Sequence, residues 1–203
     1  MIIIVTGMHR SGTSILAELL HTNNVYMAKN ENHQFKSVNN YILSLNRYSV
    51  KTLSPMTPEG NIIITEQAQS IIRSLLYEYD KKYTTWGFQD PRMCLVYSAW
   101  KFLLQKPYTN QDIKIILVQR DFEAIADSML AHGDHGKKKQ FIALAKEYYK
   151  RIFKDIDFYD FTAIIEFENL IKQPKATAAF LSKKLNWPIT DISFIDKKFN
   201  EHS

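Results

Sequence analysis

Short apolar runs alternate along the chain with longer segments in which apolar residues recur at helical spacing. A run of about four to eight residues with few polar positions is typical of a strand buried on both faces. Apolar residues at every third or fourth position are typical of a helix with one buried face. The pattern predicts strands at residues 2–5, 86–89, 113–118 and 163–167. It predicts helices at residues 11–20, 35–45, 62–79, 93–104, 122–130, 141–153 and 176–185.

The order of these elements indicates the fold class. Strands that alternate with helices favour an α/β domain with a mostly parallel central sheet, because parallel neighbours need a crossover connection. In such a sheet, ligands bind at the carboxyl ends of the strands. Residues that carry chemistry are therefore expected in the segments just after Val5, Phe88, Val118 and Phe167.

Length and composition exclude several classes of protein. The chain has 203 residues, close to the ~150 of an average domain, so a single domain over residues 1–203 is expected. With 45% hydrophobic residues, 6 Gly and 6 Pro, it is neither disordered nor collagen-like. No apolar run approaches the ~20 residues that span a bilayer, and the first residues lack the basic region of a signal peptide. We therefore expect a cytoplasmic protein that does not bind membranes, with Cys94 as a small core residue.

The charge balance is mildly basic. There are 26 Lys and Arg against 21 Asp and Glu, which gives a formal net charge of +5. Such an excess suits an anionic small ligand as well as nucleic acid. The cations are not gathered in one basic helix interleaved with aromatic residues, so nucleic-acid binding is not expected. Where the cations lie matters more than how many there are.

A glycine-containing segment follows the first strand and opens the first helix. It reads Thr6-Gly-Met-His-Arg-Ser-Gly-Thr-Ser14, with Gly7 and Gly12 at the G-x-x-x-x-G spacing of a P-loop. That geometry turns backbone N–H groups and a helix N-terminus toward one anion. The pattern predicts a phosphate site whose further ligands are Ser11, Gly12, Thr13 and Ser14.

This loop lacks the lysine of a nucleoside-triphosphate P-loop. That lysine follows the second glycine and reaches the β- and γ-phosphates, but Thr13 stands at the position here. The cation of the segment is Arg10, two residues before the glycine. Its planar guanidinium can bind an oxyanion through two N–H groups and does not lose its proton. The loop therefore favours a phosphorylated donor other than ATP.

The segment resembles the 5′-phosphosulfate loop of the sulfotransferases that use 3′-phosphoadenosine 5′-phosphosulfate (PAPS), in which Lys or Arg directly precedes Ser-Gly-Thr. The resemblance implies a three-layer P-loop NTPase-like fold with PAPS as co-substrate and no metal. It implies in-line transfer of a sulfuryl group to a hydroxyl or amine of a small-molecule or carbohydrate acceptor. Arg10 would be the cation between the 5′-phosphate of the donor and the moving sulfuryl group.

A donor with a 3′-phosphate needs a second anion site, for which the third strand supplies candidates. Arg120 stands at the end of that strand, and Ser128 lies about two helical turns into the next helix. The 3′-phosphate motif of the family is similar, with Arg-Asp-Pro after a strand and Ser eight residues after the Arg. Phe122 replaces the proline here. We expect Arg120 and Ser128 to bind one phosphate.

Two further segments resemble the family and occur in its order. Residues 86–92, Trp-Gly-Phe-Gln-Asp-Pro-Arg, resemble a Trp-Gly-Phe-Lys-Asp-Pro-Arg segment of bacterial members. Residues 165–170 resemble a strand that ends in Tyr/Phe-Glu-x-Leu. The family's lysine, which can assist the leaving group, is Gln89 in this chain. The uncharged residue keeps a second interpretation open, a catalytically impaired protein that binds PAPS or its product PAP.

An acceptor hydroxyl needs a general base, most often His or Glu. Glu31 and His33 are the candidates, because bacterial relatives carry a glutamate in an Asn-rich segment before the second helix. Asp90 and Arg92 are expected to form an ion pair that shapes the cleft. A third interpretation, an ATP-dependent small-molecule kinase, explains the glycines but not Thr13 in the lysine position.

Overall fold

A four-stranded parallel sheet forms the centre of the computed structural model, which describes residues 1–28, 32–46, 62–105, 113–157 and 161–195. The strands run in the order β2–β1–β3–β4. Their bounds are β1 Ile2–Thr6, β2 Trp86–Gln89, β3 Ile113–Gln119 and β4 Ala163–Glu166. All four strands were expected from the apolar runs, and every pairing among them is parallel, which confirms the predicted α/β fold class.

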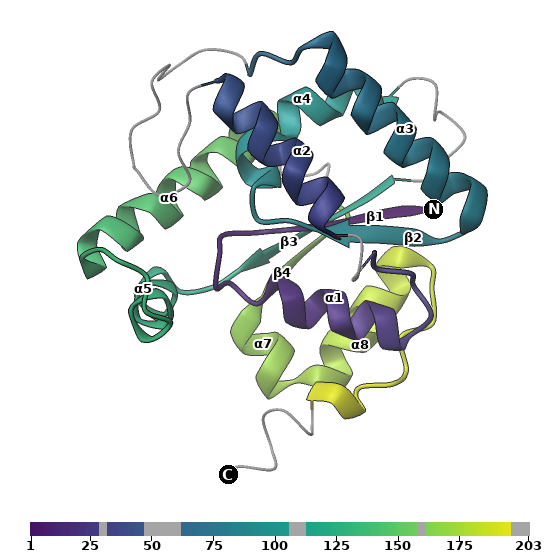
Figure 1. The fold of residues 1–203 in the computed structure, drawn as a ribbon. Helices are drawn as coiled ribbons and strands as arrows, with labels where there is room; N and C mark the ends of the chain where they lie inside the picture. Colours follow the sequence, from purple (N-terminus) through teal and green to yellow (C-terminus); the bar gives the residue numbers. More distant parts are fainter. Residues whose placement is uncertain (29–31, 47–61, 106–112, 158–160, 196–203) are drawn as a thin grey trace.

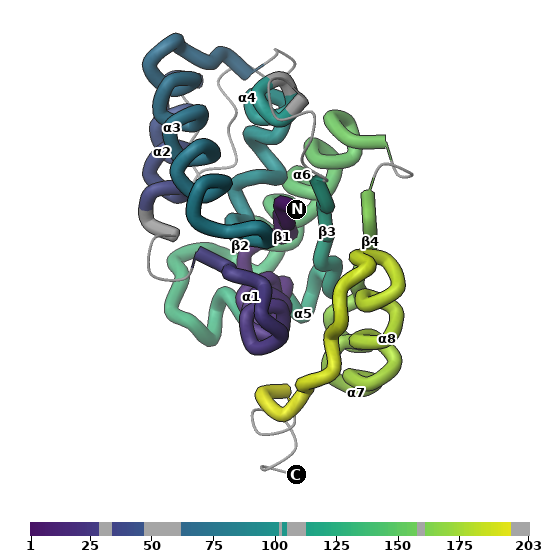
Figure 2. Tube along the Cα trace, turned by 90° about the vertical axis from the view of Figure 1, so that its right-hand side faces the viewer, coloured from purple at the N-terminus to yellow at the C-terminus, as the bar shows by residue number. Residues whose placement is uncertain are grey.

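Helices cover both faces of the sheet and make the three layers that were expected (Figure 1). One face carries α2, α3, α4 and α6, and the other carries α1, α7 and α8. In the view turned by 90°, α7 and α8 lie near β4, whereas α2 and α3 lie toward the β2 edge (Figure 2). The bounds are α1 Thr13–Thr22, α2 Asn32–Leu45, α3 Glu66–Lys82, α4 Met93–Gln105, α5 Phe122–Ala131, α6 Lys138–Asp155, α7 Phe167–Lys172 and α8 Pro174–Leu185.

The apolar strands divide their side chains between two cores. Ile2 and Ile4 of β1 pack into the cluster with α2, α3, α4 and α6, and Ile3 and Val5 pack into the cluster with α1 and α8. Successive side chains of a strand point to opposite faces, so a strand covered on both sides must be apolar throughout. All five residues of β1 are buried, as this rule requires. The loop that follows β1 therefore starts from a fully buried strand, at the carboxyl end of the sheet.

Among the element boundaries that differ from the predicted ones, three have clear local reasons. α3 begins at Glu66 because the hydroxyl of Thr65 accepts a hydrogen bond from the Ala68 amide and caps the helix. α6 begins at Lys138, where the Gln140 side chain accepts from the Lys137 amide. β4 ends at Glu166, and Phe167 begins the six-residue helix α7, which the apolar pattern did not predict. Within the described ranges, no helix is long and apolar enough to cross a membrane.

Candidate functional site

The segment between β1 and α1 forms a tight loop at the carboxyl edge of the sheet. Gly12 precedes α1 with a left-handed φ of 95° and has no side chain to collide with Phe167, whose ring occupies the space of a Cβ. The first amide groups of an α-helix have no acceptor within the helix, so those at the start of α1 are available to an anion. The loop lies where the glycine spacing predicts it, between β1 and α1, and anion binding by its amides stays a prediction.

Arg10 has an unusual backbone conformation within this loop. Its φ of 67° lies in the left-handed region, which non-glycine residues enter rarely and mostly where function or packing requires it. Its side chain is exposed, and Nε donates a hydrogen bond to Oγ of Ser128 in α5, at 3.1 Å. The structure thus brings together two residues that lie 118 positions apart in the sequence.

Arg120 lies beside Arg10 and is held by three groups. Its Nη1 donates to the backbone oxygen of Arg10 at 2.9 Å. Its guanidinium carbon lies 4.4 Å from the centre of the Phe167 ring, a cation–π contact. Glu168 forms a longer ion pair, with its Oε1 3.9 Å from Nε of Arg120. These contacts fix the guanidinium of Arg120 against the backbone of the loop at Arg10.

The hydroxyl residues of the loop differ in exposure. Ser14 is exposed at the start of α1, whereas Thr13 is buried. Ser11 is fully buried, and its amide already donates to the backbone oxygen of Met8 at 3.1 Å. Ser14 is thus the hydroxyl most open to a ligand, and contact of Ser11 with an anion stays a prediction.

Gln89 reaches the loop from the end of β2. Its Nε2 donates to Oγ1 of Thr13 at 2.9 Å, and both side chains are buried. Sequence reasoning identified both positions as places where a lysine is missing, but not that the two residues contact each other. The parallel register that pairs Val5 with Gln89 places them together, and a linear pattern does not contain that information.

Asp90 anchors a buried polar network next to the loop. Its Oδ1 accepts from Nη1 of Arg92 at 2.9 Å, which confirms the expected ion pair. Oδ2 accepts from Nδ2 of Asn39 in α2, at 2.9 Å, and Oδ1 of Asn39 accepts from Trp100 in α4. Because Asp90 is fully buried, these donors stabilise its charge. The network fixes α2 and α4 against the end of β2.

His9 is a loop residue that sequence reasoning did not single out. Its Nε2 is shielded from solvent and has no hydrogen-bond partner among the described residues. The ring meets Tyr148 edge-on, with 5.8 Å between ring centres. Burial, and secondly the charge of Arg92, lowers the pKa of His9 from 6.5 to about 4. The imidazole is therefore neutral at physiological pH.

The two predicted general bases lie wholly or partly outside the described residues. Glu31 lies outside the described residues. His33 belongs to the first turn of α2, but its side chain also lies outside the described part. In the ranges that the structure describes, no group of three or more His, Cys, Asp or Glu residues could hold a metal ion.

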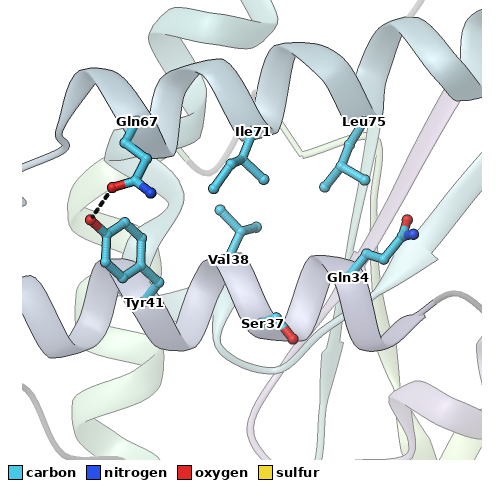
Figure 3. Close-up of a pocket in the computed structure, with 7 residues that line it drawn as sticks. All are labelled: Gln34, Ser37, Val38, Tyr41, Gln67, Ile71 and Leu75. Atoms are coloured by element: carbon cyan, nitrogen blue, oxygen red, sulfur yellow. Dashed lines mark hydrogen bonds between the residues drawn. The ribbon is translucent and has the colours of Figure 1, made fainter.

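Two cavities lie near these elements. One of about 250 Å³ adjoins Arg120 at the ends of β3 and β4, where Asp121 and Glu166 line it together with Gln119, Phe122 and Tyr149. Burial, and secondly the nearby Glu168, raises the pKa of Glu166. The other cavity, of about 580 Å³, separates α2 from α3 (Figure 3). Its lining is uncharged and shares no residue with the loop: Gln34, Ser37, Val38, Tyr41, Gln67, Ile71 and Leu75.

The parallel sheet, the glycine loop after β1 and the helix that follows define the class, a P-loop-like α/β fold. The sulfotransferase domain of the Synechococcus PCC 7002 olefin synthase has this fold, with a TM-score of 0.50 and 13% identity over 94% of this chain and 74% of that one. At this identity the likeness shows the fold and not the activity.

Two further solved structures are similar at a lower score. The sulfotransferase STF9 from Mycobacterium avium has a TM-score of 0.47 and 13% identity, and covers 98% of this chain and 68% of its own. A deoxyadenosine kinase from M. mycoides with bound dATP has a TM-score of 0.46 and 13% identity, over 92% and 100%. No protein-family model and no curated protein matches the sequence.

Proposed function

We propose that the protein is a PAPS-dependent sulfotransferase, which moves a sulfuryl group from PAPS to a hydroxyl or amine of a small acceptor. The observation that carries the proposal is the convergence of Arg10, Ser128 and Arg120 at a loop that has no lysine. The site thus carries two guanidinium groups, and both would attract an anion that bound at the loop. The ion pair of Arg120 with Glu168, at 3.9 Å, neutralises only one of them in part.

The surroundings of Arg120 indicate where a 3′-phosphate would bind. The cavity on one side of the residue is lined by Asp121 and Glu166, whose carboxylates would repel a phosphate. The loop to which Arg120 is bound offers instead the guanidinium of Arg10 and, in contact with it, the hydroxyl of Ser128, and both can donate to phosphate oxygens. We therefore assign the 3′-phosphate of the donor to the side that Arg120 shares with Arg10 and Ser128.

The 5′-phosphosulfate would lie at the start of α1. The partial positive charge of a helix N-terminus favours anions there, and the hydroxyls of Thr13 and Ser14 add donors. In the transfer, a bond forms between the acceptor oxygen and sulfur while the bond from sulfur to the bridging oxygen breaks. The electron pair stays on the phosphate of PAP, and the acceptor proton passes to a base, for which Glu31 and His33 are the candidates.

The site is less suited to an ATP-dependent kinase. Thr13 replaces the P-loop lysine, and a strand-end aspartate is needed to hold Mg²⁺. Asp90 is fully buried and bound to Arg92 and Asn39. Asp121 caps α5 by accepting from the Ala124 amide at 2.9 Å. Asp90 is thus fully engaged, and one oxygen of Asp121 is already occupied by its cap.

Ligand-induced thermal stabilisation tests the proposal. PAP at about 100 times its dissociation constant adds about 2.7 kcal/mol, which should raise the melting temperature by about 5 °C or more. ATP with Mg²⁺ should give a smaller shift. Stabilisation by ATP with Mg²⁺ and not by PAP would show that the protein is not a sulfotransferase. Stabilisation by PAP without release of labelled sulfate from PAPS to any acceptor pool would favour the impaired binding protein.

Arg120→Ala tests the assignment of the 3′-phosphate. The variant should raise the dissociation constant of PAP about 10- to 100-fold, the value of a hydrogen bond to a charged group. Binding of adenosine 5′-phosphosulfate, which has no 3′-phosphate, should weaken much less, because it loses only the support that Arg120 gives to the backbone of the loop. Arg73→Ala on α3 is the matched control, since that residue contacts Gln69 and not the loop. Equal losses for both nucleotides would remove the assignment.

A further inference from the structure

The contact between Gln89 and Thr13 gives a role to the residue that replaces the family lysine. A threonine hydroxyl has one hydrogen to donate and two lone pairs that accept. Nε2 of Gln89 donates to Oγ1 of Thr13 at 2.9 Å and so occupies one lone pair. Both side chains are buried, so water does not compete for the contact. The hydrogen of the Thr13 hydroxyl is thereby left for another acceptor.

We propose that Gln89 is a positioning residue, which holds the Thr13 hydroxyl so that its hydrogen points to the 5′-phosphate of the donor. This inference rests on the proposed function and adds how the site works without the usual lysine. The phosphate oxygen gains negative charge as the bond to sulfur breaks, and a hydroxyl oriented in advance stabilises that charge without reorganising. At position 89, an amide dipole held in place by its hydrogen bond thus replaces the flexible, charged lysine of the family.

Neighbouring elements keep the pair in place. Thr13 begins α1, and its helical backbone fixes the direction of its side chain. Gln89 ends β2 and pairs in register with Val5, the residue before the last of β1. The pair therefore joins the end of β2 to the start of α1, the helix that follows the neighbouring strand β1. It needs no movement of the loop to form.

The first experiment is a double-mutant cycle in which PAP binding is measured by titration calorimetry. Thr13→Val should raise the dissociation constant of PAP about 10- to 100-fold, because a hydrogen bond to a charged oxygen is lost. Gln89→Leu should raise it about 3- to 10-fold, as expected for a neutral hydrogen bond. The double variant should match Thr13→Val within about twofold, because Gln89 acts through the hydroxyl. Additive losses would show that Gln89 acts without Thr13 and would overturn the proposal.

A second nucleotide separates positioning from folding. Adenosine 3′-monophosphate lacks the 5′-phosphate, so its affinity should change by less than about twofold in every variant. Parallel losses for this nucleotide and PAP would mean that the variants distort the loop, and the positioning role would be wrong. Thr22→Val at the end of α1 is the matched control, since its hydroxyl donates to the Leu19 backbone and not to the site.

The charge at position 89 gives a further test. Gln89→Glu keeps the shape but offers only acceptors, so it draws the Thr13 hydrogen away from the phosphate, and PAP should bind more weakly than with Gln89→Leu. Gln89→Lys keeps a donor to the hydroxyl and should retain the affinity. A packing role predicts instead that Gln89→Leu, which fills the same space, binds like the original chain. If the unaltered protein does not bind PAP, the proposed function is wrong. If it binds PAP and the two losses are additive, only the role of Gln89 is wrong.

Discussion

The neutral, partly buried His9, whose Nε2 is shielded from solvent, predicts a dependence of stability on pH. The pKa of His9 is lowered from 6.5 to about 4 in the folded protein, so the unfolded chain binds a proton in a range where the folded one does not. The folded state keeps its full stability above pH 6.5, where His9 is neutral in both states, and loses stability as the pH falls toward 4. At about 1.4 kcal/mol per pKa unit, the full loss is about 3 kcal/mol, and about 2 kcal/mol is lost between pH 7 and pH 5.

The physical cause lies in the groups that face the imidazole. Burial makes the charged form costly, and Arg92 and Lys36 add repulsion to a protonated ring. Asp90 and Asp134 act in the opposite direction, but the carboxylate of Asp90 is already bound to Arg92. The protonated ring therefore has no strong partner in the folded state.

Urea unfolding at pH 7 and pH 5 measures the effect. His9→Gln cannot bind the proton, so its unfolding free energy should fall by about 2 kcal/mol less over this range than that of the original chain. His132→Gln is the matched control for the substitution itself, because His132 is exposed on the loop after α5. Equal pH dependence in the original chain and in His9→Gln would refute the argument.

Two substitutions test the packing of the loop against Phe167 and the buried network of Asp90 beside it. Gly12→Ala should lower the unfolding free energy by about 3 kcal/mol, since it adds a left-handed alanine and a clash with the ring above it. Gly133→Ala is the control, because Gly133 has a similar φ but open space around the added Cβ, and it should lower the unfolding free energy by about 1 kcal/mol. Equal losses for the two variants in urea unfolding would exclude the clash with Phe167. Asp90→Asn should cost about 3 kcal/mol by the same measurement, because it leaves the Arg92 guanidinium without its charge partner, and a loss below about 1 kcal/mol would show that the network does not hold α2.

The sheet could be predicted because its strands are buried on both faces. Such strands must be apolar throughout, so β1 and β3 are visible as short apolar runs between polar segments. The helix α7 could not be predicted in this way. It has six residues and one buried position, Leu170, so it contains too few turns for a helical pattern to appear. Residues 163–167 therefore look like one strand although the chain turns at Glu166.

The candidate site was predictable where a local motif carries it. The glycine spacing locates the loop, and the sequence spacing of Arg120 and Ser128 predicts a second anion site, which stays a prediction. The contacts that hold the cluster join residues far apart in the sequence, such as Thr13 with Gln89, and they depend on which strands are neighbours. Strand order is a property of the packed sheet, and no local pattern contains it.

The proposed sites for the 3′-phosphate and the 5′-phosphate are linked by residues that contact one another. Phe167 fills the space above Gly12 and also carries the guanidinium of Arg120 on its ring. Arg120 in turn holds the backbone oxygen of Arg10, the loop residue with a left-handed conformation, while the side chain of Arg10 binds Ser128. A phosphate that bound Arg120 would act on the backbone of the loop as well as on a side chain. We therefore expect the 3′-phosphate to influence how firmly the loop holds the 5′ end, so that a nucleotide with both groups is selected over one with either alone.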